Sequence, residues 1–150
     1  QKIWYHKVDS VGKPLSNLLT GCIPGADGGA GSGCLGGSNG GGFGWNDRTV
    51  YKLGYEYQSG PEWTWRVDVS TGNQPISSSE VLFNILAPGV MEEHITLGFT
   101  KQTSATGEFN FALMYAPTSD VSGPNPLDPA QQIDLRMKQY EVAASWGTKF

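Results

Sequence analysis

The chain has 150 residues, enough for one domain with a core, but glycine supplies 21 of them and charged residues only 16%. This composition favours strands and turns over helices. The net charge of -4 and the lack of any Lys or Arg cluster argue against nucleic acid as a partner. The apolar stretches are far shorter than the ~20 residues of a spanning helix, which excludes an α-helical membrane protein but not a β-barrel.

The first predicted element is a strand over residues 2–8, which is short for a membrane-crossing strand of ~9 to 11 residues. The chain begins at Gln1 without Met or a signal sequence. We therefore expect that a signal was removed or that the natural chain starts upstream.

The glycine-rich segment 10–47 follows, and we expect it to form an external loop. It contains both cysteines, Cys22 and Cys34, with no nearby His or second CxxC pair to complete a zinc site. A local disulfide is the better interpretation, and such bonds persist in an oxidising compartment.

Five further segments alternate between apolar and polar residues with a period of two, which predicts strands. They are residues 48–57, 62–70, 94–101, 108–116 and 139–150. All their aromatic residues fall on the apolar side, and all their charged residues except Lys101 fall on the other. Tyr and Trp favour a boundary between apolar and wet surroundings, as in the aromatic girdles of membrane barrels. The pattern predicts strands with one face toward lipid and one toward a lumen.

The connections between these strands alternate in length. Residues 58–61 and 102–107 are short turns, whereas residues 71–93 and 117–138 are long loops. This series is typical of an antiparallel up-and-down transmembrane β-barrel, with turns in the periplasm and loops outside the cell. We therefore predict an all-β fold of this kind.

Two long loops contain candidate ligand contacts. Residues 81–91 form an apolar run that includes Phe83 and Leu86, and exposed apolar surface of this extent usually marks a contact site. The run either lines an entry route for a hydrophobic ligand or packs over the barrel mouth. In the second loop, Met137 continues the inward parity of the last strand, together with Ile133 and Leu135.

Catalytic and metal-binding motifs are missing. His94 follows two glutamates, but no HExxH spacing is present and His6 is far away in the sequence. We expect His94 to be a polar residue facing the lumen. No GxSxG motif, paired carboxylates or Cys/His nucleophile arrangement can be assembled. The sequence therefore predicts no enzyme activity, no metal site and no cofactor.

An ordered series of short motifs extends through the chain. It consists of GFGWND at 42–47, VYKLGY at 50–55, WTWR at 63–66, FNILAPGV at 83–90 and HITLG at 94–98. This series closely resembles the C-terminal part of FadL/TodX-type outer-membrane transporters, over essentially the whole chain. Asp68 stands where members of that family often have glycine.

The resemblance implies passive transport of long-chain fatty acids or aromatic hydrocarbons across the Gram-negative outer membrane. It also implies a single barrel domain of about fourteen strands with an N-terminal plug, of which residues 1–150 supply the last six strands. On this reading the chain is a fragment that lacks the plug and the earlier strands. The expected partners are outer-membrane lipid, a hydrophobic small-molecule ligand and the barrel-assembly machinery, which would recognise the terminal aromatic Phe150.

The inward-facing cations are candidates for holding a fatty-acid carboxylate. Lys52 and Arg66 would bind such an anion well in a partly dry lumen. Alternatively, they neutralise Glu56, Glu62 or Asp68 on neighbouring strands. The full set of candidate ligand-binding residues is Lys52, Arg66, Phe83, Leu86, His94 and Met137.

Two rival functions belong to other classes. One is a secreted, soluble β-sandwich whose exposed aromatic residues stack on carbohydrate. The other is a structural or adhesive surface barrel in which the loops carry the function.

Overall fold

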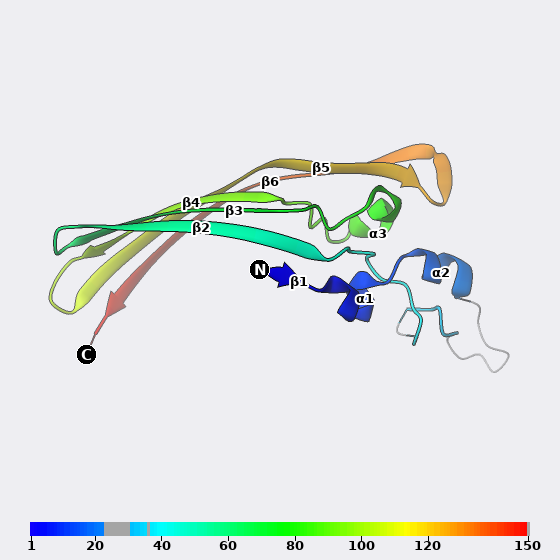
Figure 1. Cartoon of the computed structure of the whole chain (residues 1–150), viewed down its shortest axis with the longest axis horizontal. Coiled ribbons are helices and arrows are strands. Elements are labelled where there is room, and N and C mark those ends of the chain that lie inside the picture. Colours follow the sequence, from blue (N-terminus) through cyan, green and yellow to red (C-terminus); the bar gives the residue numbers. More distant parts are fainter. Residues whose placement is uncertain (23–30, 36, 150) are drawn as a thin grey trace. The chain divides into compact units, whose positions relative to one another are not determined.

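The computed structural model describes residues 1–22, 31–35 and 37–149. Consecutive strands are neighbours in one sheet, and the first four pairs are antiparallel (Figure 1). The strands among the described residues are β1 (Lys2–Ile3), β2 (Arg48–Ser59), β3 (Trp63–Gly72), β4 (Glu93–Gln102), β5 (Gly107–Asn125) and β6 (Asp128–Thr148). Strands hold 53% of the described residues, so the all-β antiparallel prediction is confirmed.

Within the described part of the chain, no helix has the length and apolar character needed to cross a membrane.

The chain divides into two compact units. The first, here called the loop unit, comprises Gln1–Thr49, Asn73–Val90 and Ser119–Met137. The second, the sheet unit, comprises Val50–Gly72, Met91–Thr118 and Lys138–Phe150. Strands β2, β5 and β6 contribute residues to both units.

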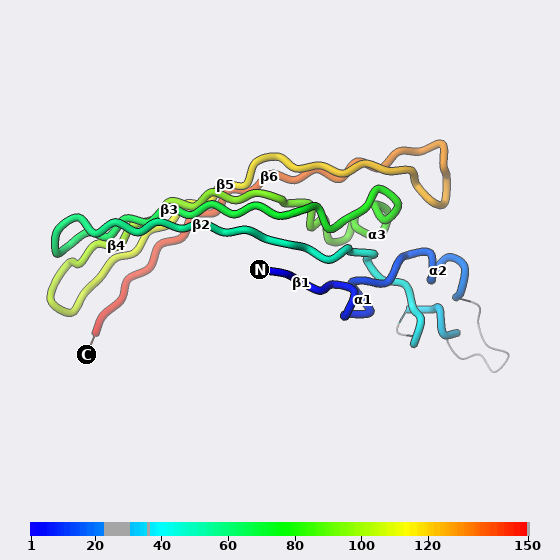
Figure 2. Tube along the Cα trace, viewed as in Figure 1, coloured from blue at the N-terminus to red at the C-terminus, as the bar shows by residue number. Residues whose placement is uncertain are grey.

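The sheet unit consists of strands joined by tight turns. Gly60, in the turn between β2 and β3, has a φ of 70°, a conformation that glycine adopts without steric cost. The turn between β4 and β5 is closed by the Thr103 N–H, which donates to the Gly107 carbonyl across 2.8 Å. Both predicted short connections are therefore present (Figure 2).

The loop unit contains short helical elements around a small core. Its helical elements are η1 (Tyr5–Lys7), α1 (Asp9–Gly12), α2 (Ser16–Gly21), η2 (Ser78–Glu80) and α3 (Val81–Asn84). The core consists of the buried Ile76, Val81, Val90 and Leu135, against which Trp45, Val121, Ile133 and Met137 pack. The predicted disulfide between Cys22 and Cys34 is confirmed.

The prediction of a strand over residues 2–8 is wrong beyond its first two residues. Only Lys2 and Ile3 pair with β2, and the chain then turns into η1 and α1. Gly12 packs so closely against the His6 backbone that a Cβ there would collide with it. His6 also bonds to Asp47 through its backbone N–H and its ring. These contacts fold the segment back on itself.

The predicted loop over residues 117–138 is instead a hairpin, because β5 and β6 extend through it (Figures 1 and 2). The Asn125 side chain accepts the Leu127 N–H across 2.9 Å and closes the turn. The alternation of buried and exposed residues in β5 changes phase at Ala116 and Pro117. Proline has no N–H to donate and is tolerated at such irregularities. The interrupted alternation explains why the sequence pattern predicted a loop here.

Candidate functional site

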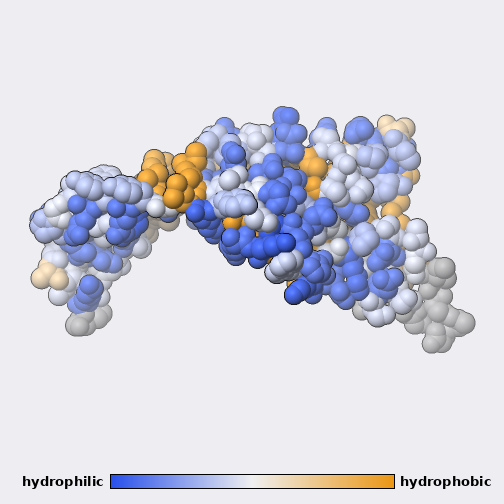
Figure 3. Space-filling view, viewed as in Figure 1, coloured by the Kyte–Doolittle hydropathy of each residue, from blue (hydrophilic) through white to orange (hydrophobic). Residues whose placement is uncertain are grey.

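The two faces of the sheet unit differ in chemistry. The strand register places apolar residues side by side in three successive rows on one face. From β2 to β5 these rows are Leu53–Val69–Ile95–Tyr115, Tyr55–Val67–Leu97–Leu113 and Tyr57–Trp65–Phe99–Phe111. Many of these side chains are exposed: Leu53 is 73% exposed and Leu97 53%. Figure 3 shows hydrophobic side chains gathered at the surface. We call this surface the apolar face.

Aromatic rings concentrate at the end of the apolar face near the tight turns. Trp63 and Trp65 are stacked, with ring centroids 5.5 Å apart, and Phe99 lies 5.4 Å from each of them. Phe111 continues the cluster at 5.6 Å from Phe99. The face also carries a shallow apolar groove of about 470 Å³. Contiguous apolar surface of this kind marks a contact with another apolar phase or molecule.

The opposite face, here called the polar face, carries a chain of hydrogen bonds across four strands. Arg66 donates from Nε to Glu56 Oε2 and from Nη1 to Thr100 Oγ1, both across 2.7 Å. The Thr100 hydroxyl donates in turn to Asn110 Oδ1 across 2.6 Å. Asn110 then contacts Glu108 with a longer bond of 3.4 Å. The network ties β2 to β5 through side chains.

Arg66 is therefore paired with Glu56, as the cross-strand alternative predicted. Its side chain remains 44% exposed. It also lines a hollow of about 350 Å³, together with Asp68, Thr96 and Ser145. Arg66 thus has two protein partners before any ligand approaches.

Lys52 and His94 lie together in the row Lys52–Ser70–His94, beside the row Gly54–Asp68–Thr96. These two rows line a second hollow of about 370 Å³ on the polar face. A Cβ at Gly54 would collide with the Asp68 carboxylate, so glycine makes room for it there. Among the residues that the structure describes, neither Lys52 nor Asp68 has a hydrogen-bond or ion-pair partner. This hollow offers an unengaged cation and an unengaged anion.

The remaining predicted ligand contacts lie in the loop unit. Phe83 stacks on Phe43 with ring centroids 4.8 Å apart and lines a hollow of about 560 Å³. Leu86 is 74% exposed, whereas Met137 packs on the core of the loop unit. Val81 and Val90 of the apolar run are fully buried in that core. Most of the run therefore serves packing, and Leu86 is its most exposed residue. Phe150 lies outside the described residues.

Sequence reasoning did not identify Asn84, a fully buried polar residue of the loop unit. Its Nδ2 donates to the Phe43 carbonyl across 2.7 Å and to the Glu80 carbonyl across 2.8 Å. Its Oδ1 accepts a hydrogen bond from Trp45 Nε1. Trp45 and Asn84 belong to two of the motifs that carry the family resemblance, and this was the only available signal.

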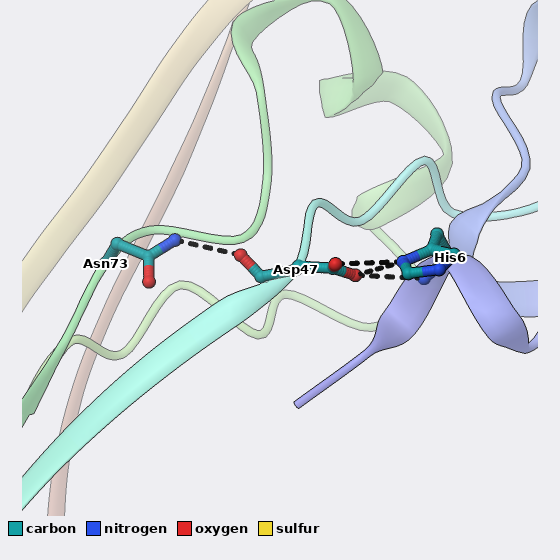
Figure 4. A network of polar contacts seen from close by, with 3 residues as sticks. All are labelled: His6, Asp47 and Asn73. Carbon is teal, nitrogen blue, oxygen red and sulfur yellow. Dashed lines mark hydrogen bonds and ion pairs between the residues drawn. The ribbon is translucent and has the colours of Figure 1, made fainter. Parts of the chain in front are cut away.

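A second polar cluster of the loop unit joins His6, Asp47 and Asn73 (Figure 4). His6 Nδ1 lies 2.8 Å from both Asp47 carboxylate oxygens, and Asn73 Nδ2 donates to the Asp47 backbone carbonyl across 3.1 Å. Desolvation opposes ionisation of Asp47. The hydrogen bonds from the His6 ring and backbone, with the charges of His6 and Lys2, outweigh it and lower the pKa of Asp47. The cluster anchors η1 to the start of β2.

The side chains of the described ranges contain no group of three or more potential ligands placed to hold a metal ion. Comparisons of the chain with protein-family models, curated proteins and solved structures found no significant match.

Proposed function

We propose that the sheet unit forms part of the wall of a transmembrane β-barrel in the Gram-negative outer membrane. The exposed apolar face carries this proposal. Leaving three adjacent rows of apolar and aromatic side chains in water forfeits roughly 25 cal/mol for each Å² of apolar surface left unburied. Hydrocarbon removes that cost, because it solvates apolar side chains and the paired strands satisfy their own backbone groups. The hydrogen-bonded polar face would then line the lumen.

The proposed barrel needs strands in addition to β1–β6. Unpaired strand edges in hydrocarbon leave N–H and C=O groups without partners, and the smallest known membrane barrels have ~8 strands. We propose that residues 1–150 are the C-terminal segment of one barrel domain of about fourteen strands, with Phe150 recognised by the barrel-assembly machinery. The resemblance to FadL/TodX-type transporters supports this size.

The proposed activity is passive transport of hydrophobic small molecules, either long-chain fatty acids or aromatic hydrocarbons. For a fatty acid, the unengaged ammonium group of Lys52 fits the carboxylate head group better than Arg66, which already contacts Glu56 and Thr100. His94 and Ser70 line the same hollow and add polar surface around the head group. The proposal assigns the protein no reaction and no cofactor.

Uptake by cells that produce the protein tests this assignment. The Lys52→Ala variant is expected to lower oleate uptake by about tenfold, the effect of losing one charge-assisted hydrogen bond. Uptake of toluene should be unchanged, because only a carboxylate gains from the cation. Lys149→Ala removes an exposed lysine just beyond the end of β6 and is the matched control.

Two outcomes would overturn the proposal. One is recovery of the folded protein in the soluble fraction, which would favour a secreted module that stacks sugars on Trp63 and Trp65. The other is membrane insertion without any uptake of oleate or toluene, which would favour a structural or adhesive barrel.

A further inference from the structure

Two lysines lie at opposite margins of the apolar face. Lys101 belongs to the row Ser59–Trp63–Lys101–Phe109, and its Nζ lies 5.0 Å from the Trp63 ring centroid. At the other margin, Lys138 Nζ lies 5.2 Å from the Tyr140 ring and 5.5 Å from the Tyr115 ring. The two tyrosine rings are stacked, with their centroids 5.1 Å apart. Each end of the face thus carries a cation over aromatic rings.

The spacing of the two lysines suits the thickness of a membrane. Lys101 pairs with Phe109, and Tyr115 follows Phe109 by six residues in β5. Tyr115 stacks on Tyr140, and Lys138 precedes Tyr140 by two residues in β6. The two lysines are therefore about eight residues apart along the strands. Eight residues of strand span about 26 Å, and a tilt of about 40° leaves roughly 20 Å along the membrane normal. Lysine side chains extend further toward water, which brings the separation close to the ~25 Å apolar band of outer-membrane barrels.

The Lys138 side chain is exposed and forms no ion pair with a carboxylate among the described residues. Its ammonium group lies over the Tyr115 and Tyr140 rings, which leave its charge without an opposite charge to neutralise it.

We propose that Lys138 binds the phosphate of an anionic lipid headgroup, at the end of the apolar face away from the tight turns. An ammonium group gives charge-assisted hydrogen bonds to phosphate oxygens, and Lys138 has no carboxylate partner among the described residues. Tyr115 and Tyr140 present apolar ring surface to the adjoining acyl chains and polar hydroxyl groups to the headgroup. This inference rests on the proposed function, because it requires the apolar face to meet lipid.

Native mass spectrometry of the purified protein in detergent tests the site with dipalmitoyl phosphatidate, dipalmitoylglycerol and inorganic phosphate as probes. Phosphatidate should bind more tightly than the diacylglycerol, which has the same chains without phosphate. The Lys138→Gln variant should weaken phosphatidate binding by about tenfold, the effect of losing one charge-assisted hydrogen bond. Lys149→Gln alters an exposed lysine just beyond the end of β6, far along the chain from Lys138, and this variant should bind like the unaltered protein.

Equal binding of the two lipids, or phosphatidate binding that Lys138→Gln leaves unchanged, would overturn the site. If inorganic phosphate competes with phosphatidate at the same concentration, the acyl chains contribute nothing to binding. That result would overturn the proposal that the bound phosphate belongs to a lipid. Insertion of the intact barrel protein, with the earlier strands as well as residues 1–150, into phosphatidylcholine vesicles, which carry no net charge, is measured in parallel. Failure to insert contradicts the proposed barrel, whereas insertion without phosphate selectivity contradicts this site alone.

Discussion

Arg66 and Glu56 stand directly opposite each other on β3 and β2, with Nε of the guanidinium donating to Oε2 of the carboxylate across 2.7 Å. Both side chains are substantially exposed, at 44% and 61%. Water therefore screens their attraction, and side-chain ordering offsets part of it. The Arg66 bond to Thr100 differs, because Thr100 is only 8% exposed.

These exposures predict that the ion pair between Arg66 and Glu56 adds little to the free energy of unfolding, and that the Thr100 hydroxyl adds more. In a double-mutant cycle of Arg66→Ala and Glu56→Ala, the coupling energy in the free energy of unfolding should be about 0 to 1 kcal/mol. Thr100→Val should cost about 1 to 3 kcal/mol, because it leaves Arg66 and Asn110 without their shared hydroxyl. Denaturant titration measures both values. A coupling energy well above that of Thr100→Val would contradict this ranking.

The proposed orientation of the apolar face predicts opposite tolerances at two adjacent residues. Leu97→Arg places a charge in the middle row of that face and should destabilise the protein by about 2 to 4 kcal/mol in a bilayer. Thr96→Arg should be mild, since Thr96 lies on the polar face opposite the unpaired carboxylate of Asp68. Folding into vesicles at graded urea concentrations gives both free energies. Equal costs would refute the assignment of that face to lipid.

The buried Asn84 should be the most sensitive polar residue of the loop unit. Asn84→Ala leaves Trp45 Nε1 and the carbonyls of Phe43 and Glu80 without their partner. Buried groups left unsatisfied cost about 1 to 3 kcal/mol each, so we expect a loss of at least about 2 kcal/mol. Asn17→Ala is the control, because its 3.3 Å bond to Asn39 is exposed and its loss should be within about 0.5 kcal/mol. Similar losses in both variants would contradict a central role for Asn84.

The strands of the sheet unit could be predicted from the sequence because each alternates regularly, with aromatic residues confined to one side. β2 and β4 follow the predicted ranges within two residues at each end. The same alternation placed Lys52, Arg66 and His94 on one face, which the register confirms. The alternation of apolar and polar residues was thus sufficient to predict both the strands and the shared face of these three residues.

Long-range contacts decided the features that could not be predicted. The turn after Ile3 depends on Asp47, and the buried position of Asn84 depends on Trp45 and Phe43, each about forty residues away. No local pattern encodes such pairs. The sequence pattern also left open whether Lys52 or Arg66 is the cation available to a ligand, because either could pair with Glu56 or Asp68. Only the distances in the structure show that Arg66 is the one that pairs with Glu56.

The contact between His6 and Asp47 predicts a stability change in acid. Because the pKa of Asp47 is lowered from its ordinary value of 3.8, the folded protein binds a proton at this carboxylate less readily than the unfolded chain does. The Asp47 carboxylate therefore contributes its full stabilisation at pH values above the pKa of Asp47 in the unfolded chain. This stabilisation is lost as the pH falls through 3.8 toward the lower pKa of Asp47 in the folded protein.

Asp47→Asn should consequently destabilise the loop unit at neutral pH, and the difference from the unaltered protein should shrink in acid. Denaturant titrations between about pH 6 and pH 2 measure this convergence. Asp134→Asn, which removes an exposed carboxylate without an ion pair among the described residues, is the control and should show a much smaller change with pH. Parallel pH profiles for Asp47→Asn and the unaltered protein would mean that the Asp47 carboxylate adds no stability. The segment would then be held by the hydrogen bond from Asn73 to the Asp47 backbone carbonyl, which the substitution leaves in place.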